Sequence, residues 1–156
     1  MALLRARVEE TMIKRLRRYM LAAQMAVDPT GANPDLTDPL ATALQEMGNV
    51  PADVLAIGNT DLAAVAGADN VEFLDRVELR LLKNILGNLP ETDMSAEWGS
   101  ESRNQLPERV RQMILDKEKT VMLLWGAPGA IDATDAGSNS LTGGVLVFNF
   151  EDRWID

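Results

Sequence analysis

Three long stretches of the chain place apolar residues at every third or fourth position, the spacing of one face of an α-helix. They cover residues 2–27, 69–88 and 102–126 of the 156 residues. The stripes expected to be buried are Leu4, Val8, Met12, Leu16, Tyr19, Met20 and Ala23 in the first stretch, Leu74, Val77, Leu81, Ile85 and Leu86 in the second, and Val110, Met113, Ile114, Val121 and Leu124 in the third. The pattern predicts a mainly α fold, a helical bundle of three long helices plus short helices.

Shorter helices are expected between the first two stretches. Residues 37–49 predict a helix with Thr37 or Asp38 as its N-cap, Pro39 in its first turn and Gly48 at its end. Residues 50–59 and 60–67 predict two further short helices, each closed by a glycine. For the long stretches, Asp69 is the candidate cap of the second, Gly87 its expected stop, and Pro107 belongs in the first turn of the third.

The segment "LTGGVLVFNF", residues 141–150, has the composition of a β-strand. Leu146, Phe148 and Phe150 would point to one side, and Val145, Val147 and Asn149 to the other. The sequence therefore predicts two parts, a helical bundle domain over residues 1–126 and a flexible loop with an extended β arm over residues 127–156. The strand could pair within the chain, for example with residues 94–98, or with another chain by strand addition. Both interpretations remain open.

Residue types exclude several catalytic classes. The chain has no Cys and no His, so a Ser-His-Asp or Cys-His arrangement cannot form, and no Ser has a Lys three residues later. "DATDAGSN" (132–139) lacks the spacing and closing Glu of a calcium loop, and "GAPG" (126–129) lacks the Lys of a phosphate-binding loop. We therefore predict no catalytic residue, cofactor or metal. A small carboxylate-dependent enzyme stays an alternative, because the chain has 24 acidic residues.

Charge is unevenly distributed along the chain. The net charge is -9, yet residues 1–18 carry six basic and two acidic side chains, so the other 138 residues carry -13. The basic candidates for charged contacts are Lys14, Arg15, Arg17 and Arg18. They could form the solvated face of a helix, meet an acidic patch on a neighbouring subunit, or bind phosphates. The last interpretation gives a second alternative, a nucleic-acid-associated regulatory protein.

Residues 73–114 suggest a family. A long "ELRLLKNIL" helix, a connector ending in "GSES" and a second amphipathic helix, "LPERVRQMILDKEK", together resemble the head–tail connector (adaptor or neck) proteins of tailed bacteriophages. The resemblance covers less than a third of the chain. It implies an all-helical bundle with an extended arm, assembled as a twelve-membered ring under the portal protein, and it brings no catalytic residues.

This resemblance defines the expected function and partners. We expect a structural virion protein at the head–tail junction, assembled in the host cytoplasm, that binds itself, the portal protein and a tail or neck protein. DNA would pass through an acidic channel without specific binding, and no membrane is involved, because no apolar run approaches about 20 residues. The expected inter-subunit arm comprises Val145, Leu146, Val147, Phe148 and Phe150, with Trp154 as an anchor.

Overall fold

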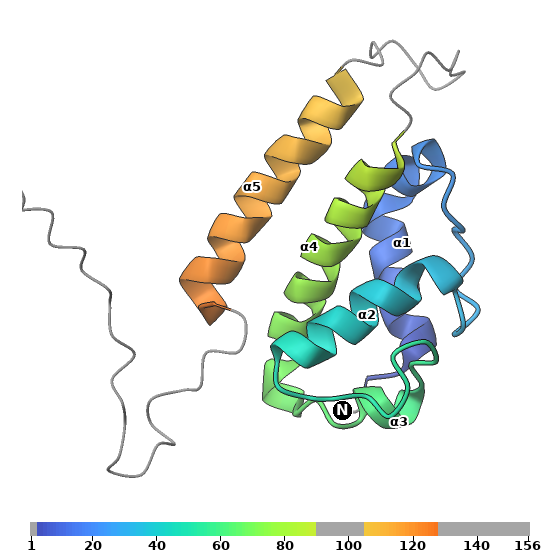
Figure 1. Cartoon of the computed structure of the whole chain (residues 1–156), viewed down its shortest axis with the longest axis vertical. Helices are drawn as coiled ribbons and strands as arrows, with labels where there is room; N and C mark the ends of the chain where they lie inside the picture. The colour runs from blue at the N-terminus through green and yellow to red at the C-terminus, as the bar shows by residue number, and fades with distance from the viewer. Residues whose placement is uncertain (1–2, 90–104, 128–156) are drawn as a thin grey trace, which may run out of the picture.

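Five α-helices and one short 3-10 helix make up the described part of the computed structural model, residues 3–89 and 105–127 (Figure 1). They are α1 (Arg5–Ala22), α2 (Pro34–Glu46), α3 (Asn59–Leu62), η1 (Gly67–Asp69), α4 (Asn70–Asn88) and α5 (Gln105–Trp125). Within these residues no strand occurs, so the predicted mainly α class is confirmed. The predicted strand at 141–150 and its candidate partner at 94–98 lie outside the described residues.

Helix α1 is shorter than the 26 residues that its apolar pattern suggested. It stops at Ala22 because Gln24 takes a left-handed conformation, φ 58°, with the Met25 amide donating to the Met20 carbonyl and the Gln24 amide to the Leu21 carbonyl. This is the hydrogen-bond pattern of a Schellman cap, usually made by glycine. At the other end Leu4, expected in the core, is the exposed N-cap residue.

Helix α2 starts one turn earlier than predicted. Its N-cap is Asn33, whose side-chain oxygen accepts from the Asp35 amide at 3.0 Å, and Pro34 occupies the first helical position. The expected caps Thr37 and Asp38 are therefore inside the helix, and so is Pro39. The prediction of the cap was wrong because Asn-Pro and Thr-Asp-Pro both look like helix starts, and only packing selects between them.

The segment after α2 contains less helix than predicted. Residues 50–58 form turns and bends, so the first of the two expected short helices is absent, whereas α3 corresponds to the second. Asp53 holds the turn through the Leu55 amide at 2.8 Å, and Asp61 accepts from the Gly58 amide at 2.8 Å. Local side-chain hydrogen bonds of this kind compete with helix formation.

Helix α4 is the centre of the bundle, since α1, α2 and α5 all pack on it (Figure 1). Its fully buried residues include Phe73, Val77, Leu81 and Ile85, and it ends at Asn88, one residue beyond Gly87. Pro107 lies in the first turn of α5, as predicted. The ion pair of Lys83 with Glu118 and the hydrogen bond of Trp125 with Asp75 show that α5 runs antiparallel to α4, because the later residue of α4 meets the earlier residue of α5.

Candidate interaction surfaces

The basic side chains singled out from the sequence are all exposed on α1. Lys14 and Arg15 make ion pairs with acidic side chains of the chain. Lys14 Nζ lies 2.7 Å from Glu10 Oε1, and Arg15 Nη1 lies 2.6 Å from Glu78 Oε2 on α4. Arg17 and Arg18 are likewise exposed. All four side chains are therefore on the surface of α1, and Arg15 connects α1 to α4.

The Lys14–Glu10 pair gives a direct titration test. A hydrogen bond and the positive charge of Lys14 lower the pKa of Glu10. Replacing Lys14 with Met is expected to raise the Glu10 pKa towards its ordinary value, measured by NMR titration of the side-chain carboxyl. Arg17→Met is the matched control and should shift the Glu10 pKa less. An unchanged Glu10 pKa in Lys14→Met would contradict the pairing.

Arg5 and Glu9 form a buried ion pair in the described part of the chain. The sequence pattern did not predict it. Arg5 Nε donates to Glu9 Oε1 at 2.9 Å, and Glu9 is fully inaccessible to solvent. The available signal was an opposite-charge pair four residues apart, interleaved with the apolar stripe of α1. Charged residues are rarely buried without such pairing.

The pair connects four segments that are distant in sequence. Glu9 accepts backbone amides from Gly31 at 2.6 Å and from Asn33 at 3.0 Å. Gly31 suits this turn because its φ of +76° disfavours other residues. The Arg5 guanidinium donates to the carbonyls of Ile57 and Asn33 and to Thr37 Oγ1. The pair therefore fixes the 23–33 loop, the start of α2 and the segment before α3 onto α1.

Acidic side chains of α4 are also engaged by cations. Lys117 of α5 lies 2.6 Å from Asp75 and 3.1 Å from Glu78, and Trp125 Nε1 donates to Asp75 at 3.1 Å. On the side facing α2, the buried Arg76 binds Glu72 at 2.7 Å. In residues 3–89 and 105–127 no group of three or more acidic side chains is arranged to hold a metal ion. Asp75 and Glu78 thus join α4 to α5, whereas the Arg76–Glu72 pair lies within α4.

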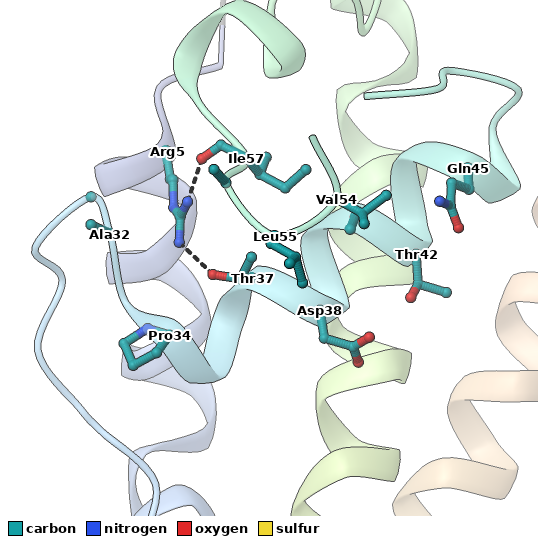
Figure 2. Close-up of a pocket in the computed structure, with 13 residues that line it drawn as sticks. Arg5, Ala32, Pro34, Thr37, Asp38, Thr42, Gln45, Val54, Leu55 and Ile57 are labelled. Carbon is teal, nitrogen blue, oxygen red and sulfur yellow. Dashed lines mark hydrogen bonds between the residues drawn. The ribbon is translucent and has the colours of Figure 1, made fainter. Parts of the chain in front are cut away.

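An open groove of 810 Å³ lies between α2 and the segment 54–57 (Figure 2). Thr37, Asp38, Thr42 and Gln45 project from α2 along one side, and Val54 and Leu55 stand opposite (Figure 2). Arg5 closes one end through its hydrogen bonds to Ile57 and Thr37. The volume is within the range of ligand-binding clefts, roughly 300–1,000 Å³. Nothing in the sequence pattern had indicated this groove.

The exposed side of α5 is polar over most of its length, but it carries apolar side chains at Leu115 and in its last turn. The buried face uses Val110, Ile114 and Val121 against α4, whereas Leu124, expected in the core, is exposed. We define the α5 outer patch as the exposed apolar residues Leu115, Met122, Leu123 and Leu124. Leu123 is 85% exposed. Three of these residues are consecutive at the end of the helix, so the patch is concentrated there.

The predicted arm residues Val145, Leu146, Val147, Phe148, Phe150 and Trp154 lie outside the described residues. Among the helices that the structure describes, none is both long and apolar enough to cross a membrane. Neither a scan against protein-family models nor searches of the curated proteins and the solved structures find a match to this chain.

Proposed function

We propose that this chain is a structural subunit of a tailed-phage head–tail connector that assembles into a ring with copies of itself. The observation that carries the proposal is the α5 outer patch. A helix at the edge of a monomer normally exposes a polar face, whereas α5 exposes Leu123 and two large apolar neighbours at its end. Contiguous exposed apolar surface marks protein–protein contacts.

The patch lies directly before the arm predicted from the sequence. Gly126 ends α5 with φ +75°, so the chain leaves the helix next to Met122–Leu124. In the proposed subunit, a bundle of three long helices carries a C-terminal β arm. Val145, Leu146, Val147, Phe148 and Phe150 of the arm dock on a neighbour, with Trp154 as an anchor. The patch and the arm then form one continuous contact surface.

Charge supports the same arrangement. A ring contact is heterologous and joins two different surfaces of identical subunits. The basic face of α1, with Arg17 and Arg18, would face acidic groups of a neighbour or of the portal protein. The net charge of -9 would let DNA pass through the ring without adhering. The role requires no catalytic residue, cofactor or membrane, and it places the protein in the neck of the virion after assembly in the host cytoplasm.

The resemblance of residues 73–114 to connector proteins supports the specific assignment. That family implies a twelve-membered ring between the portal protein and a tail or neck protein. The described part of that segment comprises α4 and the first half of α5, which pack on each other. This packing leaves the α5 outer patch accessible to a second subunit.

The Leu123→Asp variant tests the patch. Burying a leucine side chain contributes about 1.5–3 kcal/mol, so placing a carboxylate there is expected to weaken subunit association at least tenfold. The measurement is the concentration dependence of particle mass by light scattering. Val50→Asp is the matched control, because Val50 is 83% exposed, lies outside the helices and is remote in sequence from α5. Equal association by the two variants would contradict the role of the patch.

A further inference from the structure

The groove between α2 and residues 54–57 has features of a binding site for an extended peptide. Its rim includes Leu55, a large apolar side chain that is 84% exposed. Across from it, Thr42 and Gln45 offer hydrogen-bonding groups one helical turn apart on α2 (Figure 2). An extended segment needs both, since its side chains require apolar contacts and its backbone amides and carbonyls require partners.

We propose that this groove receives the strand segment, residues 145–150, of a neighbouring copy of the chain. The inference rests on the proposed function and names the surface that the arm of one subunit contacts on the next. A heterologous ring contact needs a donor surface and a different acceptor surface. The arm with the α5 outer patch would be the donor, and the groove the acceptor.

Charge matches the groove to this segment. Residues 141–150 carry no charged side chain, which is unusual in a chain with 25% charged residues. The two charged residues that line the groove are already engaged. Arg5 is paired with Glu9 at 2.9 Å, and Asp38 accepts from Asn84 at 2.9 Å. A neutral, apolar segment therefore enters the groove without breaking the Arg5–Glu9 ion pair or the Asn84–Asp38 hydrogen bond.

Chain length allows the contact. Residues 127–140 join the end of α5 to the segment, and 14 residues span at most roughly 45–50 Å when extended. As a flexible chain they span about 20 Å on average. The end of α5 and the 47–58 segment both lie at the lower end of the molecule in Figure 1. A subunit placed beside this end brings its groove within reach of the neighbour's arm.

Disulfide trapping tests the docking, because the natural chain contains no cysteine. Thr42→Cys and Val147→Cys are made in separate full-length chains, mixed and oxidised. We expect a two-chain product on a non-reducing gel, with the two cysteine-bearing peptides joined as identified by mass spectrometry. Val50→Cys mixed with Val147→Cys is the control and should give at least tenfold less product. Equal product from both mixtures overturns the proposal.

Further experiments distinguish a failure of the groove inference from a failure of the proposed function. Leu55→Asp is expected to weaken association at least tenfold, whereas Val50→Asp leaves it unchanged; circular dichroism checks that both fold. If Leu55→Asp assembles normally while removal of residues 141–156 dissociates the assembly, the arm docks elsewhere and only the groove inference fails. If the doubly substituted Thr42→Cys/Val147→Cys chain forms only an internal disulfide, docking between copies is refuted. A full-length chain that is monomeric at all concentrations refutes both.

Discussion

Replacing Glu9 with Gln is expected to lower the free energy of unfolding by about 3–5 kcal/mol, because it leaves the buried Arg5 guanidinium without its counter-charge. Glu9 also accepts the Gly31 and Asn33 amides. Its two oxygens therefore face three N–H donors. Glutamine has one oxygen and one NH₂ group, so either orientation of its amide places donors against donors.

The neighbouring residue gives the control. Glu10→Gln removes the same charge from a side chain that is 52% exposed and paired with Lys14, and should lower stability far less than Glu9→Gln does, because exposed ion pairs are screened by solvent. Urea unfolding followed by circular dichroism, at one fixed protein concentration, measures both variants. Equal urea midpoints of unfolding for Glu9→Gln and Glu10→Gln would show that the buried Arg5–Glu9 ion pair does not stabilise the fold.

Deleting residues 141–156 is the second change with a large expected effect. It removes the proposed donor segment of the ring contact while retaining the ion pairs and the core that residues 3–89 and 105–127 form. We expect the assembly to dissociate into folded monomers, seen as a fall in particle mass with an unchanged helical spectrum. The physical reason is the loss of backbone pairing and of the apolar side chains Leu146, Phe148 and Phe150.

Point variants test whether subunit association depends on the apolar side chains of the arm, because they change those side chains without shortening the chain. Phe148→Asp adds a carboxylate to the predicted strand and should dissociate the assembly nearly as well as the deletion. Ser140→Asp adds the same charge just before the strand and should leave the mass unchanged. If the truncated chain forms a particle with as many subunits as the full-length chain does, the arm is not needed for subunit association.

The long helices were predictable because one physical rule, apolar spacing at three or four residues, decides their existence. Their ends were less predictable, because backbone conformation and packing decide them. Gln24 ends α1 in a conformation usually reserved for glycine, and Asn33 caps α2 although Thr37 looked equally suitable. Residues 50–58 looked helical by composition, but hydrogen bonds to Asp53 and Asp61 hold turns there.

The surfaces were only partly predictable. The exposed face of α1 with Arg17 and Arg18 follows from the helical period. The burial of Arg5 with Glu9 does not, because it depends on the carbonyls and amides that Ile57, Asn33 and Gly31 bring from other segments. The groove likewise forms only when α2 and residues 54–57 are brought together. The position of Leu124 outside the core depends on which face of α5 meets α4.

The mass of the full-length chain in solution tests the central claim most directly. One subunit has a mass of 17.1 kDa. Native mass spectrometry across a range of concentrations is expected to show a closed assembly whose mass is a whole multiple of that value, with ring-shaped particles under the electron microscope. A single species of 17.1 kDa at every concentration measured would contradict the proposal that the chain assembles with copies of itself.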